Sequence, residues 1–316
     1  MFNLYKRKIP EVFCKQALQT LKKFNFSKSI SPNAILTAEE SVLLLKNPKV
    51  KFFDIRDPKN YEESHVPGSR NLNSVFSYLA TSDDIGKKDL QLTFEELFQD
   101  SGLNKDDHAI LYEDALNNRF GASCRGWYLL NLFGHSNVSI MHGGWKKWVQ
   151  LGYPVTKELP KEGHGNFECH WNKDFWANKE DVFNVVSKKD TTTKLVDVRD
   201  NVEWVGDSSS PYGIDFTPRK GRIPGAIHVL WSDLMKTENG ITHLKDNAEI
   251  KKILNDKGIQ EKDNIIIYCF KGARASNSFI CFKKAGFENV RNYFASWNEW
   301  SRDMKMPIDD KKLKLH

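Results

Sequence analysis

The chain has 316 residues, of which 40% are hydrophobic and 28% are charged, and this composition is typical of globular proteins rather than disordered or collagen-like ones. The length predicts two domains, and no apolar stretch approaches the roughly 18 residues of a membrane span. The formal net charge of +6 does not indicate a polyanion partner, because residues 1–30 alone carry seven basic residues against one acidic residue. We therefore expect a protein that binds neither nucleic acid nor a membrane.

The first predicted element is a basic tail, residues 1–33. Its apolar residues recur at helical spacing between lysines (Phe13, Ala17, Leu21), as in an organelle transit peptide or a surface-packed N-terminal arm. The first interpretation makes the tail a presequence and predicts a mitochondrial location, and the second predicts the cytoplasm. Both are intracellular, which also suits five scattered cysteines without a C-x-x-C pair.

After the tail, the chain contains the same series of motifs twice. The repeats lie in residues 34–155 and 174–312, and residues 156–173 between them mix charges, glycine and proline in the manner of a linker. The matching segments are 52–56 with 195–199, 65–69 with 222–226, 109–112 with 265–268, and Trp145 and Trp148 with Trp297 and Trp300. We therefore predict two domains of one fold.

Each half alternates short apolar runs with helical stretches. A strand over 109–112 precedes a helix over 123–133, and a strand over 265–268 precedes a helix over 276–285. This alternation predicts the α/β class, with tandem domains that each hold a parallel sheet flanked by helices on both faces. We interpret the W-x-x-W pairs as packing residues and the D-x-R pairs, Asp54 with Arg56 and Asp197 with Arg199, as polar ties within each domain.

The halves differ in the loop that follows the central strand. Glu113 occupies this position in the first half, whereas Cys269 occupies it in the second. Lys271, Gly272 and Arg274 then lead into the helix. Backbone amides at a helix start, together with two cations, favour an anion and the thiolate form of a cysteine. We therefore predict that Cys269 is the nucleophile and that the first half is not catalytic.

The C-x-K-G-x-R loop, with the D-x-R, I-P-G-A and W-x-x-W motifs, resembles the rhodanese family of sulfurtransferases over roughly residues 34–310. The resemblance implies a duplicated domain whose second copy carries a persulfide on Cys269. It also implies that Lys271, Gly272 and Arg274 bind a small anionic sulfur donor, with no metal or other cofactor. Thiosulfate is the expected donor, cyanide, a thiol or a thioredoxin is the expected acceptor, and the protein is expected to be a monomer.

The sequence departs from the usual family pattern at four positions of the second half. Arg222 replaces a histidine before I-P-G-A, and Glu203 stands where vertebrate-type two-domain enzymes have an arginine. Phe294 and Ala295 replace an acid and a glycine before Ser296. The effects of these replacements on the site are open at this stage.

The second half also contains an insertion. Asp54 to Pro67 spans 13 residues, whereas Asp197 to Pro224 spans 27. The added segment includes Arg219 and Lys220, which we treat as candidate substrate-binding residues because loops often carry binding groups.

Three other functions are compatible with parts of the pattern. A 3-mercaptopyruvate sulfurtransferase would use the same cysteine with a different donor. A rhodanese-like module could bind an anion or a protein partner without catalysis. A phosphatase would use the same loop chemistry, but its relatives of this fold place one more residue between the cysteine and the arginine, so we rank it last.

Overall fold

The computed structural model describes residues 34–161 and 163–314. The predicted tail, residues 1–33, therefore lies outside the described part of the chain, as does Cys14. Among the described helices, none has the length and apolar character needed to cross a membrane.

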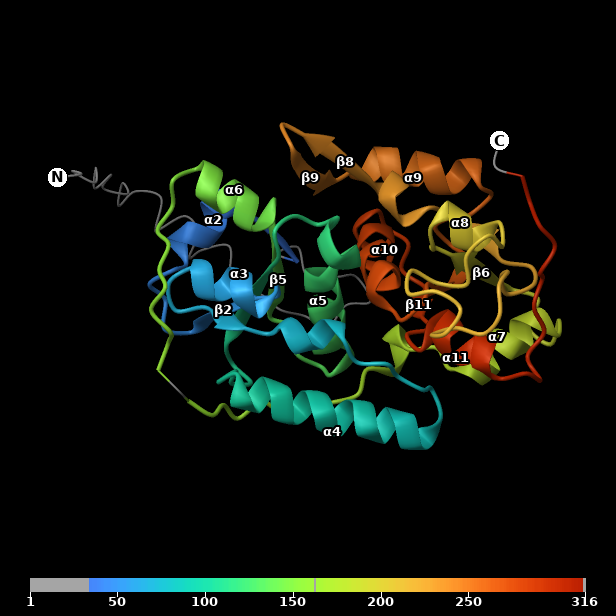
Figure 1. Ribbon diagram of the computed structural model, residues 1–316, viewed down its shortest axis with the longest axis horizontal. Helices are drawn as coiled ribbons and strands as arrows, with labels where there is room; N and C mark the ends of the chain where they lie inside the picture. The colour runs from blue at the N-terminus through green and yellow to red at the C-terminus, as the bar shows by residue number, and fades with distance from the viewer. Residues whose placement is uncertain (1–33, 162, 315–316) are drawn as a thin grey trace.

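Two parallel sheets form the centres of the two halves (Figure 1). The first has the strand order β1-β5-β4-β2-β3 and the second β11-β10-β6-β7, and every pairing within them is parallel. The strands are β1 (Ile35–Thr37), β2 (Val50–Asp54), β3 (Arg70–Asn71), β4 (His108–Tyr112) and β5 (Val138–His142), then β6 (Thr193–Asp197), β7 (Ile227–His228), β10 (Asn264–Tyr268) and β11 (Val290–Asn292). A separate antiparallel hairpin contains β8 (Met235–Glu238) and β9 (Ile241–Leu244). This topology confirms the predicted tandem α/β class.

Helices cover both faces of each sheet. In the first half they are α2 (Ala38–Leu43), α3 (Pro58–Glu63), α4 (Asp84–Asp100), α5 (Ala122–Leu132) and α6 (Gly144–Gln150). In the second half they are α7 (Lys179–Val186), α8 (Asn201–Trp204), α9 (Asn247–Asp256), α10 (Ala273–Lys284) and α11 (Ser296–Arg302). Short 3₁₀ turns are η1 (Asn73–Phe76), η2 (Asn118–Phe120), η3 (Lys173–Phe175) and η4 (Trp231–Leu234).

The central strands are apolar on both sides because helices cover both faces of a parallel sheet. All of β4 is buried, as is β10 apart from Asn264. The helix after β10 begins at Ala273, three residues before the predicted start, because Gly272 at φ 88° supplies the left-handed turn from which the helix starts. Arg274 therefore lies in the first helical turn rather than in the loop.

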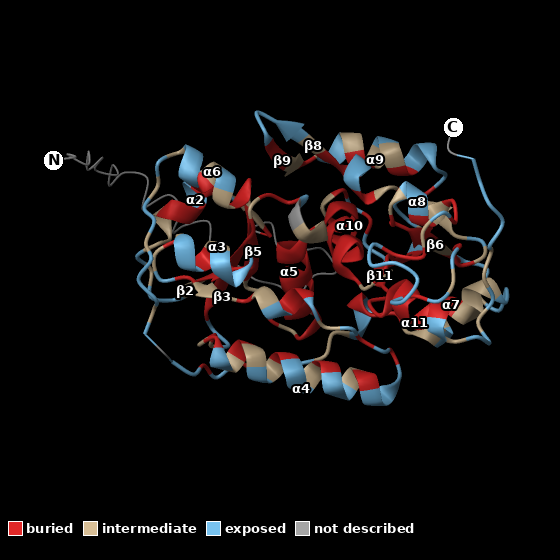
Figure 2. Ribbon diagram, in the orientation of Figure 1, coloured by how far each residue is buried: buried red, intermediate tan, exposed pale blue. Residues whose placement is uncertain are grey.

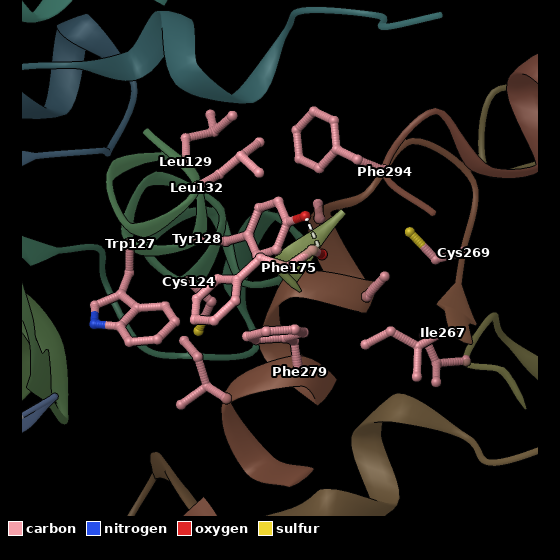
Figure 3. Packing of buried hydrophobic residues seen from close by; sticks show 14 of the residues in the cluster. Cys124, Trp127, Tyr128, Leu129, Leu132, Phe175, Ile267, Cys269, Phe279 and Phe294 are labelled. Atoms are coloured by element: carbon pink, nitrogen blue, oxygen red, sulfur yellow. Dashed lines mark hydrogen bonds between the residues drawn. The ribbon is translucent and has the colours of Figure 1, made fainter. Parts of the chain in front are cut away.

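The two halves meet along helices α5 and α10, which lie side by side at the centre of the molecule (Figure 1). Both are buried along almost their whole length, whereas α4 has an exposed outer face (Figure 2). Tyr128 of α5 packs against Phe279, Phe175 and Phe294 of the second half, and its hydroxyl donates to the Phe175 carbonyl over 2.9 Å (Figure 3). This interface brings first-half side chains to the N-terminal end of α10.

The linker region also contacts the first half. Backbone amides of Gly165, Phe167 and His170 donate to carbonyls of Gln99, Leu103 and Phe133, respectively, at 2.7–3.1 Å. The exact domain boundaries at residues 155 and 173 stay predictions.

Each half ties the end of a central strand with an aspartate, an arginine and a tryptophan. The arginine pairs with the aspartate over 2.6 Å in both halves, and its guanidinium lies over the tryptophan ring. The residues are Asp54, Arg56 and Trp145 in the first half and Asp197, Arg199 and Trp297 in the second. These contacts confirm that the repeated D-x-R and W-x-x-W motifs are structural.

Arg222 and its counterpart His65 each pair with the segment that follows the last helix of their half. His65 pairs through its backbone with Thr156, and Arg222 pairs with Asp309, so both fasten the last segment of their own half. The Arg222 side chain strengthens this contact with a 2.7 Å salt bridge to Asp309. Arginine in place of the family histidine therefore keeps the backbone pairing and adds a salt bridge to it.

Arg219, in the insertion, has a structural place of its own. Its guanidinium donates to four backbone carbonyls at and after the end of α11, at 2.7–2.9 Å, and these belong to Trp300, Ser301, Asp303 and Met306. Lys220 donates to the Asp207 carbonyl over 2.8 Å. The donors of Arg219 are thus occupied by the protein itself, and we correct its expected role from substrate binding to anchoring the insertion.

We predict that Arg219→Ala lowers the free energy of unfolding by about 1–3 kcal/mol, because several charge-assisted hydrogen bonds are lost at a half-exposed site. Denaturant titration measures this change, and Lys220→Ala, which removes one exposed contact, is the matched control. The reactivity of Cys269 toward an alkylating reagent should be the same in both variants. Loss of that reactivity in a stable Arg219→Ala protein would restore Arg219 to the site.

Candidate active site

Cys269 lies directly after β10, and α11 fixes the backbone of its loop. The backbone amides of Trp297 and Asn298 donate to the carbonyls of Cys269 and Phe270 at 3.0 and 2.9 Å. The Cys269 amide donates to the hydroxyl of Ser296 over 3.2 Å. The backbone at Cys269 and Phe270 is therefore fixed by α11.

The cysteine sulfur faces the start of α10. Its Sγ accepts the Gly272 backbone N–H over 3.1 Å, and the side chain is only 1% exposed. The first amides of a helix have no partner within the helix, so this end suits an anion. A Cβ at Gly272 would approach the Phe294 ring to 2.6 Å and the Phe294 carbonyl oxygen to 2.8 Å, so the turn accepts glycine only.

Lys271 presents a cation without a carboxylate partner among the described residues. Its Nζ lies 4.0 Å from the ring centroid of Phe76 and 5.0 Å from that of Tyr212. Burial lowers the pKa of Lys271 to about 8, and the nearby charge of Arg125 adds to the lowering. An incoming anion would relieve both effects, so Lys271 is the candidate donor-binding cation of the loop.

Arg274 differs from the expectation of a free substrate-binding cation. Its guanidinium is 2% exposed, lies 2.7 Å from Asp200 and forms a salt bridge with Glu203. Although burial opposes the charge, the carboxylate of Glu203 raises the pKa of Arg274 above its ordinary value. We therefore correct its role: Arg274 braces the start of α10 against α8. The acid at Glu203, a departure from the family pattern, is what neutralises this arginine.

Arg125 is a site residue that sequence reasoning did not identify. It belongs to α5 of the first half, is fully buried, and donates to the Lys271 carbonyl over 2.6 Å and to the Tyr78 carbonyl over 2.5 Å. Burial lowers the pKa of Arg125 to about 10, and a thiolate at Cys269 would oppose this lowering. No local motif marks Arg125, because its contact with Lys271, two residues after Cys269, arises only from the packing of the two halves.

Phe294 accounts for the third departure from the family pattern. Its ring stacks on Tyr128 with centroids 5.5 Å apart (Figure 3). The guanidinium carbon of Arg125 lies 4.6 Å from the centroid of the same ring. The ring thus fills the interface between the halves. It gives Arg125 a cation–π contact where an acid would have given it an ion pair.

In the first half, the side chain of Glu113 occupies the start of α5, which is the equivalent of the helix end beside Cys269. The Glu113 carboxylate accepts the amides of Ala122 and Ser123 at 3.2 and 3.1 Å and the Ser123 hydroxyl at 2.5 Å. Burial raises the pKa of Glu113 to about 8. A buried carboxyl therefore occupies the helix end that stays available beside Cys269 in the second half.

The insertion covers one side of the catalytic loop. The ring of Tyr212 lies 5.3 Å from that of Phe270 and 5.4 Å from that of Phe216, between centroids. The insertion therefore contributes aromatic cover for Lys271 through Tyr212, whereas substrate binding by Lys220 stays a prediction.

The other cysteines lack this environment. Cys124 and Cys281 are buried, and burial raises the pKa of each thiol. Among the residues that the structure describes, no cluster of histidine, cysteine and carboxylate side chains could hold a metal ion.

Sequence comparison identifies relatives across most of the chain. The Rhodanese-like domain family matches twice, at residues 37–151 and 183–303. A Haloferax volcanii protein, provisionally named a thiosulfate sulfurtransferase, is 34% identical over 80% of this chain and 86% of its own length. The sulfur carrier protein TtuD of Thermus thermophilus is 29% identical over 84% of this chain and 92% of its own. The thiosulfate sulfurtransferase of Rattus norvegicus is 29% identical over 77% and 80%.

Solved structures share the fold. EanB in complex with hercynine superposes with a TM-score of 0.74 at 20% identity, covering 88% of this chain and 70% of that chain. The anaerobic ergothioneine biosynthesis enzyme of Chlorobium limicola superposes with a TM-score of 0.72 at 19% identity, covering 88% and 70%. At this identity the likeness concerns the fold alone. The two family matches and the duplicated sheets together show that the chain belongs to the rhodanese family, as a member with two tandem domains.

Proposed function

We propose that the chain is a sulfurtransferase that moves the outer sulfur of thiosulfate to a thiophilic acceptor through a persulfide on Cys269. The Cys269 thiolate attacks the outer sulfur, an S–S bond forms to Sγ, and the S–S bond of thiosulfate breaks. Sulfite leaves with the bonding electron pair, and the persulfide keeps one negative charge. Cyanide, a thiol or a thioredoxin then attacks the outer persulfide sulfur and regenerates the thiolate.

The observation that carries this proposal is the charge arrangement around Cys269. Lys271 and Arg125 are two cations without carboxylate partners in the described chain, one from each half, and the Gly272 amide at the start of α10 donates to the Cys269 sulfur. Such preorganised positive groups stabilise both the thiolate and the charge that develops on departing sulfite. The names of the relatives from Haloferax volcanii and Rattus norvegicus support the same donor. The reaction as written needs no metal or organic cofactor.

The central test is transfer of one sulfur atom to Cys269. After incubation with thiosulfate, peptide mass spectrometry of the wild type should find one added sulfur on the Cys269 peptide. Cys269→Ala should remain folded and lose transfer entirely, because no other described cysteine has these surroundings. Cys124→Ser, a buried cysteine next to the interface, is the control and should behave like wild type. Sulfur found on another peptide, or transfer by folded Cys269→Ala, would contradict the proposal.

Lys271 should make donor use depend on pH. Since its pKa is about 8, Lys271 is cationic below that pH and neutral above it, so kcat/KM for thiosulfate should fall as pH rises through about 8. Lys271→Met should lose about ten- to hundredfold in kcat/KM, the value of one charge-assisted contact, whereas Lys271→Arg should retain activity at high pH.

The same variants test the donor. Thiosulfate is a dianion and 3-mercaptopyruvate carries one carboxylate, so wild type should prefer thiosulfate and Lys271→Met should prefer it less. A higher wild-type kcat/KM for 3-mercaptopyruvate would make that compound the donor instead.

The first half should not become catalytic when it is given a cysteine. In Glu113→Cys combined with Cys269→Ala, we expect no sulfur transfer, because the single cation of the longer first-half loop, Arg119, is paired with Asp57. Glu113→Cys alone, with Cys269 intact, is the control for folding and should transfer sulfur normally. Activity in the double variant would show that the first-half loop can form the same site.

A further inference from the structure

Arg125 differs from the other buried arginines in its lack of a carboxylate. Five arginines are buried in the described chain, and four of them form salt bridges, namely Arg56 with Asp54, Arg199 with Asp197, Arg222 with Asp309, and Arg274 with Glu203. The hydrogen bonds of Arg125 go to two carbonyls, its ring contact is with Phe294, and its Nε is buried without a hydrogen-bond partner among the described residues. A buried cation without a counter-charge is strongly destabilising, so the fold implies an anion for it.

The charged and titratable side chains around Arg125 are, with one exception, either already paired or not anionic. Arg119 is paired with Asp57, and Arg274 is paired with Glu203 and Asp200. The Glu299 carboxylate is held by Ser82 and Tyr293. Lys271 is itself a cation, and burial raises the pKa of the Tyr212 phenol, which is therefore neutral. Cys269, which lies two residues before the carbonyl that Arg125 holds, is the remaining group whose ionised form would act on the Arg125 charge.

We propose that Arg125, from the half without a catalytic cysteine, is a positioning residue of the sulfur-transfer site, where it holds the Lys271 carbonyl and stabilises the anionic sulfur of Cys269. This inference rests on the proposed function for the identity of the anion. The first half is then part of the site, although it contains no nucleophile. Phenylalanine at position 294 is part of the same arrangement, because an acid there would pair with Arg125 and remove its charge from the sulfur.

The two unpaired cations have different roles. The pKa of Lys271 is about 8 and the residue is only partly buried, which suits a group that meets the donor. Arg125 is fully buried and fixed by two carbonyls, which suits a permanent charge for the thiolate and the persulfide alike.

The test is a thiolate titration that needs no sulfur donor. The ultraviolet absorbance of the Cys269 thiolate is followed against pH in wild type, Arg125→Gln and Arg125→Lys, each corrected with its own Cys269→Ser counterpart. Arg56→Lys is the matched control, since Arg56 is also a buried arginine of the first half that lies over an aromatic ring but is paired with Asp54. In Arg125→Gln the titration midpoint should rise by about one pH unit or more, about tenfold less thiolate at acidic pH. It should rise less in Arg125→Lys and stay unchanged in Arg56→Lys.

A second variant, Phe294→Asp, tests the same role of Arg125 if Arg125→Gln does not fold. Phe294→Asp keeps Arg125 and places a carboxylate against its guanidinium, so it should also raise the midpoint and should lower kcat more than it raises KM for thiosulfate. An unchanged midpoint in folded Arg125→Gln would show that Arg125 is only a structural residue. If Arg125→Gln does not fold, an unchanged midpoint in Phe294→Asp would show the same. Failure of wild type to take sulfur from thiosulfate would instead overturn the donor assignment, and the titration would still decide the role of Arg125.

Discussion

The packing of α5 against α10 is the contact on which the site depends. Parallel sheets place their loops at the carboxyl ends of the strands, so each half alone would present one loop and one helix end. The apolar interface around Tyr128 and Phe279 joins these ends and buries the start of α10 against first-half side chains. Removal of water from this region strengthens every charge interaction near Cys269. A duplicated domain thereby becomes one site with contributions from both copies.

Within that interface, pairing with carboxylates decides the role of each arginine. Arg274 is neighbour to Cys269 in sequence, yet Glu203 and Asp200 neutralise it and make it a brace. Arg125 is distant from Cys269 in sequence. Because it has no carboxylate partner among the described residues, we propose that its charge acts on the Cys269 sulfur. The substitutions at Glu203 and Phe294 thus act in opposite directions, since one removes a free cation and the other leaves a cation unpaired. A count of basic residues in the loop could not show this balance.

The two halves place different side chains at the equivalent helix end. Glu113 places its carboxylate on the helix amides that an anion would otherwise use, and the first-half loop is longer. The backbone support is nevertheless the same in both, because Trp145 donates to the Glu113 carbonyl as Trp297 donates to that of Cys269. The scaffold has therefore been retained while the side chain at one position determines whether the helix end is filled or available.

The repeated motifs, the alternation of strands and helices and the single cysteine after β10 were sufficient to predict the tandem α/β fold and to select Cys269, because these features depend on local spacing and residue type. The start of α10 was predicted three residues late, since the left-handed turn at Gly272 lets the helix begin at once. The roles of Arg219, Arg274 and Arg125 depended on tertiary structure, because an arginine is free, paired or structural according to which carboxylates and carbonyls surround it after folding. Local sequence was enough to nominate Cys269 as the nucleophile, and the packing of the two halves decided the charges around it.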